Sequence, residues 1–424
     1  MYSLYSALLA LAFMLAVPYF LWKGRATGKY RVSFRERMGS LPPDLNPDRT
    51  PSIWIHAVSV GEVLTARVLL GPLRERFPQL RLVVSTTTVT GHSVARSGLG
   101  EADALFFAPF DFRGPVRKAL ASVNPRLLLL METELWPNLI HEARRAGVRI
   151  VVANGRLSAG SCGRYRRIRF LLRHVLAEVD LFLMQGSAHA ERARAIGAPP
   201  DRVRVAGNLK FDAIGEQAAP AALARLLAPA MEPGPLLVAG STMPGEEVMV
   251  LTAFRQVRAR FPQARLILVP RHPERFAEAE GLVQIAGLSC VRRTTLAVEP
   301  WSVGDVLLLD TMGELASIYP AAEVVFVGGS LVPSGGHNVL EPAAAGKAVV
   351  VGPHMENFQE IADQFRSAGA LVQVAGPERL AEALLELLAD PARRREVGER
   401  ARSLLLESRG AVGRTVEALA ELLA

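Results

Sequence analysis

Short, solidly apolar runs recur along most of the chain and alternate with longer amphipathic stretches. Uninterrupted apolar strands separated by helices are typical of a parallel sheet that is covered on both faces. The pattern predicts an α/β protein with two doubly wound, Rossmann-like domains in tandem, and a ligand-binding cleft between them. The expected strands are 53–58, 81–86, 104–109, 126–132, 149–154, 181–185 and 203–207, then 236–241, 266–270, 306–310, 324–329 and 348–353.

The alternation pauses in the middle of the chain, which marks a domain boundary. A chain of 424 residues is too long for one ordinary core. Residues 213–235 are rich in Ala and Pro and predict an interdomain linker. We therefore expect a first domain at 52–212 and a second at 236–424, which takes in the C-terminal helices.

The N-terminal segment has a pattern of its own. Residues 2–22 carry no charged side chain, and about 20 apolar residues suffice to cross a bilayer as a helix. Basic residues follow this run, whereas a cleaved signal peptide carries them before it. We expect residues 1–22 to be a transmembrane anchor, and the positive-inside rule puts the rest in the cytoplasm. A helix lying along the membrane is the alternative, which Pro18 favours.

The charge is concentrated in the segment that follows the anchor. The formal net charge is +8, but residues 23–37 alone hold six basic residues and one acidic, a net of +5, which leaves +3 for the rest. Residues 23–37, within the juxtamembrane and linker segment 23–51, thus account for most of the net positive charge, and we expect no nucleic-acid partner. Only Cys162 and Cys290 are present, so a disulfide framework is excluded.

The stretch HAVSVGE contains the first candidate for chemistry. Ser59 and Glu62 have the spacing of a capping box, in which Glu62 would accept a hydrogen bond from the Ser59 backbone N–H. The same carboxylate would lie at a strand-to-helix turn, where α/β enzymes bind ligands. A helix N-terminus should favour its ionised form. The residues alone leave both roles open, fastener and catalyst.

Two further motifs place charged residues in the first domain. Glu132 and Glu134 directly follow an apolar strand in LLLLMETELWP, and Lys210 lies in GNLKFD beside the linker. Paired carboxylates suggest a metal, but the chain has no D-x-D and no nearby His or Cys at ligand spacing. We expect no metal site.

A glycine-rich stretch in the second domain predicts a phosphate-binding loop. In FVGGSLVPSGGHNVLEPAAAGK, Gly335 and Gly336 lead into a helix that we expect to begin near His337. Glycines let a backbone approach a ligand closely, and a helix N-terminus attracts phosphate. Glu341, one turn along, could accept hydrogen bonds from a ribose. An ordinary glycine-rich loop with a capped helix is the alternative.

Two other strand ends in the second domain carry polar residues. Arg271 follows the strand of LVPRHPE, and Glu314 follows the Met312–Gly313 turn of DTMGEL. These could meet a phosphate and a base edge. The G-x-G-x-x-G fingerprint of dinucleotide-binding enzymes follows neither 53–58 nor 236–241, which disfavours an oxidoreductase.

An amphipathic stretch in the first domain carries a cluster of arginines. In GRYRRIRFLLRHVL, residues 163–176, helical spacing predicts a buried stripe and an opposite basic face. An aromatic side chain within arginines suits an anionic membrane surface or a phosphorylated lipid, and a solvated basic face is equally compatible. The stripe comprises Ile168, Leu171, Leu172, Val175 and Leu176, and the basic face Arg166, Arg169, Phe170 and Arg173.

Taken in order, these motifs resemble those of the 3-deoxy-D-manno-octulosonic acid (Kdo) transferases of lipopolysaccharide synthesis, which are GT-B glycosyltransferases. The resemblance rests on HAVSVGE, METELWP, NGRLS, GNLKFD, LVPRHPERF, DTMGEL and GGHNVLEPAAAGK. It implies a CMP-Kdo donor, a tetraacylated lipid A precursor as acceptor, inversion at the anomeric centre, no metal or cofactor, and work at the cytoplasmic face of the inner membrane.

The resemblance also implies residue roles. The general base matches Glu62, and groups that stabilise the transition state match Glu132 and Lys210, with Glu134 an alternative to Glu132. The CMP contacts match Pro270, Arg271, Met312, Gly313, Glu314, Asn338, Val339, Leu340 and Glu341. Three other functions share parts of the pattern: a GT-B transferase that uses a UDP-sugar, a nucleotide-sugar epimerase, and a membrane-tethered nucleotide-binding protein without catalysis.

Overall fold

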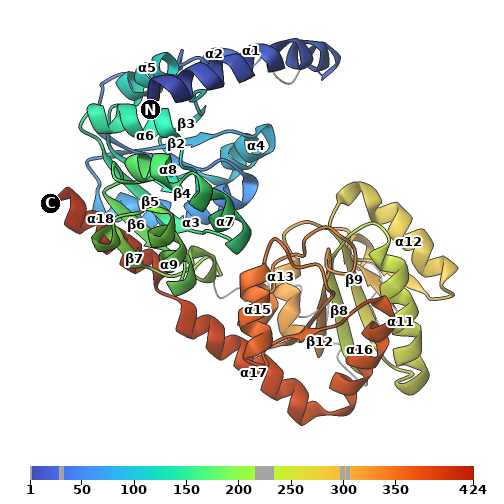
Figure 1. The fold of residues 1–424 in the computed structure, drawn as a ribbon. Coiled ribbons are helices and arrows are strands. Elements are labelled where there is room, and N and C mark those ends of the chain that lie inside the picture. Colours follow the sequence, from blue (N-terminus) through green and yellow to red (C-terminus); the bar gives the residue numbers. More distant parts are fainter. Residues whose placement is uncertain (1, 28–32, 215–233, 297–300, 302–305) are drawn as a thin grey trace. The chain divides into compact units, whose positions relative to one another are not determined.

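The chain forms two compact units in the computed structural model (Figure 1). Unit 1 comprises Met1–Ala213 and Ser408–Ala424, and unit 2 comprises Ile214–Glu407. The structure describes residues 2–27, 33–214, 234–296, 301 and 306–424. Residues 28–32 of the basic segment and 215–233 of the expected linker lie outside the described residues.

Unit 1 is built on a seven-stranded parallel sheet in the order β3-β2-β1-β4-β5-β6-β7. Its strands are β1 (Ser52–His56), β2 (Arg81–Thr86), β3 (Ala104–Phe107), β4 (Pro125–Met131), β5 (Arg149–Gly155), β6 (Leu181–Met184) and β7 (Val203–Val205). The helices are α1 (Tyr2–Thr27), α2 (Phe34–Arg37), α3 (Val60–Arg76), α4 (Val89–Gly98), α5 (Arg113–Val123), α6 (Pro137–Arg145), α7 (Ala159–Arg167), α8 (Arg169–Leu176), α9 (Ser187–Ile196) and α18 (Ala411–Leu423), with 3-10 turns η1 (Pro200–Arg202) and η2 (Leu209–Phe211).

Unit 2 repeats the plan with the strand order β10-β11-β9-β8-β12-β13-β14, again parallel. The strands are β8 (Leu236–Thr242), β9 (Arg265–Pro270), β10 (Cys290–Arg292), β11 (Val306–Leu308), β12 (Val324–Val327), β13 (Ala348–Val351) and β14 (Val372–Gln373). The helices are α11 (Glu246–Arg260), α12 (Phe276–Ile285), α13 (Leu315–Ile318), α14 (Leu340–Ala344), α15 (Gln359–Ser367), α16 (Leu380–Ala389) and α17 (Pro391–Ser408), with 3-10 turns η4 (Pro273–Arg275), η5 (Arg293–Thr295), η6 (Tyr319–Ala321) and η7 (Pro377–Arg379).

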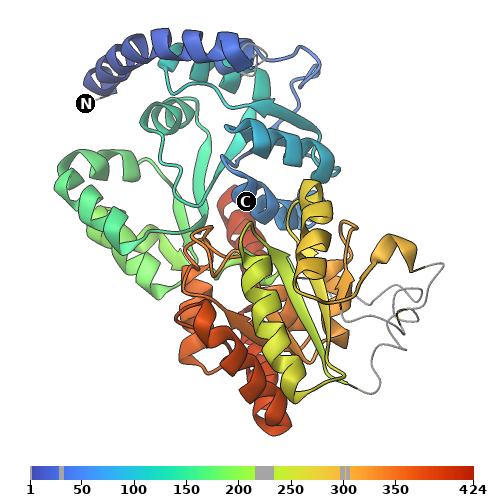
Figure 2. The same ribbon diagram turned by 90° about the vertical axis from the view of Figure 1, so that its right-hand side faces the viewer.

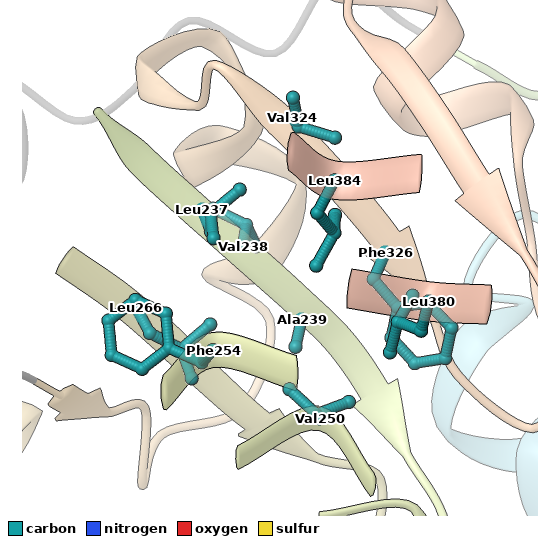
Figure 3. Close-up of a pocket in the computed structure, with 10 residues that line it drawn as sticks. All are labelled: Leu237, Val238, Ala239, Val250, Phe254, Leu266, Val324, Phe326, Leu380 and Leu384. Carbon is teal, nitrogen blue, oxygen red and sulfur yellow. The ribbon is translucent and has the colours of Figure 1, made fainter. Parts of the chain in front are cut away.

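The prediction of two Rossmann-like parallel sheets is confirmed. Every residue of β1 and of β12 is buried, as expected of strands that lie between two layers of helices. In unit 2, apolar side chains of β8, β9 and β12 pack against α11 and α16 around a small cavity (Figure 3). No polar side chain lines it, so it belongs to the core.

Each sheet has a central point where the strand order reverses. In unit 1 this point lies between β1 and β4, and in unit 2 between β8 and β12. Open parallel sheets bind ligands beyond the carboxyl ends of the strands at this switch point. The loops that follow these four strands are therefore where a site is expected in each unit.

The C-terminal helix corrects the predicted domain boundary. We expected residues up to 424 in the second domain, but α18 joins the core of unit 1 through Ala411, Ala418 and Leu419. The Asp212 carboxylate holds the start of α18, because it accepts the backbone N–H groups of Gly410 at 2.7 Å and Val412 at 2.6 Å. The last helix thus packs against the sheet of unit 1.

The expectation of a membrane-spanning helix at residues 2–22 is not supported. Residues 2–27 do form one helix, α1, yet within the described residues no helix combines the length and apolar character that crossing a bilayer requires. Instead, the start of α1 lies along α5 and α6 of unit 1 (Figures 1 and 2). The Tyr5 hydroxyl donates to Asp111 at 2.9 Å and the Ser6 hydroxyl to Asn138 at 3.1 Å, which keeps polar groups of α1 paired with the unit.

Candidate active site

Glu62 lies at the switch point of unit 1, in the first turn of α3, and is 6% exposed. One carboxylate oxygen accepts the backbone N–H of Val58 at 2.8 Å, and the other accepts the Ser59 hydroxyl at 2.8 Å. Ser59 caps α3 as predicted, since its side chain accepts the Glu62 N–H. The return bond differs from the expected one, because it comes from Val58 and not from the Ser59 backbone.

The electrostatic prediction for Glu62 was wrong in direction. Burial raises the pKa of Glu62 to about 7, and the hydrogen bonds from Val58 and Ser59 offset this only in part. The charges of Glu134 and Glu132 raise the pKa further. A carboxylate with a pKa near neutrality is well matched to general-base catalysis, because it is partly ionised and still basic enough to take a proton.

Glu132 and Glu134 follow β4, the strand next to β1, and so reach the same switch point as Glu62. Glu132 has a φ of 54°, a left-handed conformation that non-glycine residues adopt at a cost. Glu134 accepts the indole N–H of Trp136 at 2.8 Å, and burial raises its pKa. The structure therefore brings together the three glutamates that the sequence singled out in the first domain.

Lys210 lies in η2, where the backbone N–H of Lys210 donates to the Asn208 side chain at 3.0 Å. This turn is fixed to the sheet by Asn154, whose side-chain oxygen accepts the Leu209 N–H at 3.0 Å. Asn154, the last residue but one of β5, has a φ of 54° and is 1% exposed. The strained Asn154 thus positions the GNLKFD turn beside the strand that neighbours β4.

Removing the charge of Glu134 should lower the pKa of Glu62. Glu134→Gln keeps an oxygen for the Trp136 indole but no longer repels the Glu62 carboxylate. We expect the titration midpoint of the Glu62 carboxyl, followed by NMR, to move to lower pH. Glu191→Gln, on the exposed surface of α9, serves as the control and should leave that midpoint in place. A shift to higher pH in Glu134→Gln would contradict this electrostatic account.

The glycine loop of unit 2 comprises residues 328–337 and leaves β12 at its switch point. Gly335 and Gly336 have φ angles of 86° and 74°, which favour glycine. A Cβ at Gly335 would lie 2.4 Å from the Asn357 side chain, and one at Gly336 2.5 Å from the Met355 sulfur. The helix that we expected near His337 begins later, at Leu340, and is the five-residue α14. The Asn338 side chain accepts the Leu340 N–H at 3.1 Å.

The groups that face this loop form an electrostatic cluster. Burial lowers the pKa of His337 to about 4, and the charges of Arg271 and His272 act in the same direction. Burial raises the pKa of Glu341, which the Asn338 hydrogen bond and the Arg271 charge oppose. Arg271 is exposed and directly follows β9. The charge of Arg271 thus acts on a neutral imidazole and a carboxyl group beside this loop, whose glycines make room for the Asn357 and Met355 side chains.

The remaining predicted donor contacts are of unequal kinds. Met312 is 61% exposed and Gly313 has a φ of 86°, so this turn is accessible. Glu314 accepts hydrogen bonds from Thr311 and from Arg293, the latter at 3.0 Å, which is typical of a structural role. Pro270, Val339 and Leu340 are buried, so the latter two could offer a ligand only their backbone.

The arginine-rich stretch at residues 163–176 differs from the single predicted helix. The helix is interrupted at Ile168, which separates α7 from α8. Leu172, Val175 and Leu176 are buried as expected, but Ile168 is 45% and Leu171 38% exposed, because the break takes them out of register with the stripe. The exposed face does carry the predicted set of Arg166, Arg169, Phe170 and Arg173.

Sequence reasoning missed one pair of residues in unit 2. Glu246 and Glu247 are both fully buried in the first turn of α11. The only sign of them in the sequence is the pair of adjacent acidic residues in TMPGEE. Acidic residues are common at helix starts, where the helix dipole favours them, so this pair did not stand out. In the described part of the chain, no three His, Cys, Asp or Glu side chains are grouped so that they could hold a metal ion.

Comparison with known proteins identifies the family. Residues 32–213 match the family described as 3-deoxy-D-manno-octulosonic-acid transferase (kdotransferase), and residues 248–404 match glycosyl transferases group 1. The 3-deoxy-D-manno-octulosonic acid transferase of Bordetella pertussis is 37% identical over 406 residues, which are 93% of this chain and 93% of that one. The protein of the same name from Haemophilus influenzae is 34% identical over 397 residues, which are 92% and 91% of the two chains.

A solved structure shows the same fold at low identity. The UDP-GlcNAc 2-epimerase of Neisseria meningitidis aligns with a TM-score of 0.54 at 12% identity over 84% of this chain and 99% of that chain. This likeness concerns the fold alone and agrees with the two Rossmann-like domains predicted from the strand pattern. Because the sequence relatives cover nearly the whole chain, the protein belongs to the 3-deoxy-D-manno-octulosonic acid transferase family and is a glycosyltransferase.

Proposed function

We propose that the protein transfers Kdo from CMP-Kdo to a lipid A precursor, a phosphorylated glucosamine disaccharide with four acyl chains, with inversion and without a metal. One observation carries this proposal: Glu62 lies at the switch point of unit 1 with a pKa of about 7, in a chain of this transferase family. A hydroxyl of the acceptor would attack the anomeric carbon of the sugar, and Glu62 would take the hydroxyl proton. The bond from that carbon to the CMP oxygen would break, and CMP would leave with the bonding electrons.

The charged groups of each unit have a place in this reaction. The CMP leaving group gains negative charge, which Arg271 beside the glycine loop would stabilise. In unit 1, Lys210 and Glu132 would stabilise the charges of the transition state. Asn338 and Glu341 lie beyond the glycine loop that follows β12, and Gly313 lies in the loop that follows β11. All three would contact the nucleotide, since they lie past the carboxyl ends of parallel strands of unit 2.

The choice of donor separates this proposal from a transferase that uses a UDP-sugar and from an epimerase. We expect CMP to compete with CMP-Kdo and UDP to have little effect at equal concentration. Consumption of CMP-Kdo should require the lipid acceptor, whereas an epimerase converts its substrate alone. EDTA should leave the rate unchanged. Competition by UDP but not by CMP would refute the proposed donor.

Two surfaces of unit 1 support a contact with the inner membrane on its cytoplasmic side. Along α1, Leu4, Leu8, Leu11 and Leu15 are 52–74% exposed at a spacing that puts them on one face. On α7 and α8, exposed Phe170 lies among arginines, and such a surface suits anionic headgroups. We propose that unit 1 rests on the membrane through these side chains, with α1 along its surface.

Replacing two of these leucines should weaken binding to vesicles. Leu8→Ser with Leu11→Ser removes two large apolar side chains, each worth about 1.5–3 kcal/mol when fully buried, so we expect at least about 10-fold weaker sedimentation with phosphatidylglycerol vesicles. Leu406→Ser, on α17 and 50% exposed, is the matched control and should bind as the wild type does. Equal loss in both variants, or in neither, would contradict a specific role for α1.

A further inference from the structure

Glu246 makes an unusual set of contacts at the switch point of unit 2. Its carboxylate is fully buried. One oxygen accepts the backbone N–H groups of Met243 at 2.8 Å and Gly329 at 2.6 Å. The other accepts those of Ser330 at 3.0 Å and Leu331 at 2.8 Å. Four backbone donors thus occupy the four acceptor positions of one carboxylate.

These bonds join the two strands between which the order of the sheet reverses. Met243 follows β8, whereas Gly329, Ser330 and Leu331 begin the glycine loop that follows β12. Gly329 in turn accepts the N–H of Gly336 at 2.8 Å, so the glycine pair is tied to the residue that Glu246 holds. The side chain of His337 packs on Gly329, where a Cβ would lie 2.8 Å from the imidazole.

The neighbouring Glu247 holds the other loop of the donor site. It accepts the Thr242 hydroxyl at 2.9 Å and the Arg275 guanidinium at 2.6 Å. The Thr242 carbonyl accepts the N–H of Arg271 at 2.9 Å. The two buried glutamates therefore fix the loops that present His337 and Arg271.

We propose that Glu246 is a positioning residue for donor binding, whose carboxylate holds the glycine loop in the shape that receives the nucleotide. A loop that is already ordered binds its ligand without the entropic cost of ordering. Glutamine could not make the same contacts, because every orientation of its amide turns an NH₂ group toward two N–H donors. This inference rests on the proposed function, since it takes the loop as the donor site.

The test compares Glu246→Gln with a variant that weakens the same unit elsewhere. Val324 lies at the start of β12, at the end of the strand away from the loop, and lines the apolar cavity of the core (Figure 3). Val324→Ala removes packing there and leaves the loop contacts in place. KM for CMP-Kdo, KM for the acceptor, the Kd for CMP and the thermal midpoint are measured for both variants and the wild type.

We expect Glu246→Gln to raise the KM for CMP-Kdo and the Kd for CMP at least about 10-fold, with the acceptor KM unchanged. Val324→Ala should lower the thermal midpoint without this donor-specific change. An unchanged donor KM in Glu246→Gln, or an equal rise in Val324→Ala, would overturn the proposal. If the Gln variant does not fold, Glu246→Asp is the deciding variant. Aspartate keeps an acceptor-only carboxylate but is one methylene shorter, so it should hold the loop less well and raise the donor KM. A normal donor KM in this variant would also overturn the proposal.

The wild type separates this inference from the proposed function. If the wild type neither binds CMP nor uses CMP-Kdo, the proposed function fails and the role of Glu246 in donor binding falls with it. If the wild type does both and Glu246→Gln retains its donor KM, only the inference about Glu246 fails.

Discussion

Glu62→Gln is expected to reduce Kdo transfer by about 10²–10⁴-fold, the contribution that is typical of a positioned general base. Glutamine can still accept the Val58 N–H through its oxygen, so helix α3 should keep its start. It cannot take the proton of the attacking hydroxyl. The measurement is kcat/KM for transfer to the lipid acceptor, together with the thermal midpoint as a check of folding.

The pH profile adds a second result for the same residue. Glu62 acts as a base only when it is ionised, and its pKa is about 7. The wild-type kcat/KM should therefore rise with pH through about 7 and level off above it. The residual activity of Glu62→Gln should lack this limb. If a folded Gln variant is fully active, Glu62 is a fastener of α3, and the base must be sought at Glu132 or Glu134.

Arg271→Ala is expected to raise the KM for CMP-Kdo by about 10–100-fold, the range of one or two lost charge-assisted hydrogen bonds. The charge of Arg271 already acts on His337 and Glu341 across the glycine loop, so it stands where a phosphate would meet it. The acceptor KM should not change, because the effect concerns the nucleotide. Steady-state kinetics with each substrate varied in turn provide the measurement.

A matched arginine serves as the control for Arg271. Arg255 lies on the exposed side of α11 in the same unit, and Arg255→Ala should leave both KM values as in the wild type. If Arg271→Ala leaves the donor KM unchanged, or raises the acceptor KM as much as the donor KM, the nucleotide does not bind at this loop as proposed.

Much of the fold could be predicted from the sequence because buried parallel strands are solidly apolar. Two strands escaped notice, β10 and β14, which are short and only partly buried. The place of α18 could not be predicted either. The amphipathic pattern of a helix shows that one face is buried but not against which sheet, and here that sheet belongs to unit 1.

The location of Glu62 could be predicted, but its ionisation could not. The strand-to-helix turn is a local feature, whereas the burial of Glu62 and the approach of Glu132 and Glu134 arise from strands that pair only in the folded sheet. The helix-dipole effect on which the sequence prediction relied is worth about 0.3–1 kcal/mol. Desolvation of a buried carboxylate outweighs it.

The contacts of Glu246 were beyond the sequence for the same reason. Its partners Gly329, Ser330 and Leu331 are 83–85 residues away in the sequence and meet it only at the switch point. Two acidic residues at a helix start are common and give no sign of such partners. The position of α1 along unit 1 likewise depends on pairs such as Tyr5 with Asp111, which hydropathy does not register.

The most direct test of the central claim is the mass of the lipid product. Purified protein is incubated with CMP-Kdo and the tetraacylated lipid A precursor in the presence of EDTA, and the acceptor is followed by mass spectrometry. We predict that the wild type increases the acceptor mass by one or more Kdo units and that Glu62→Gln, folded and able to bind CMP, does not. An unchanged acceptor mass with the wild type would contradict the proposed reaction.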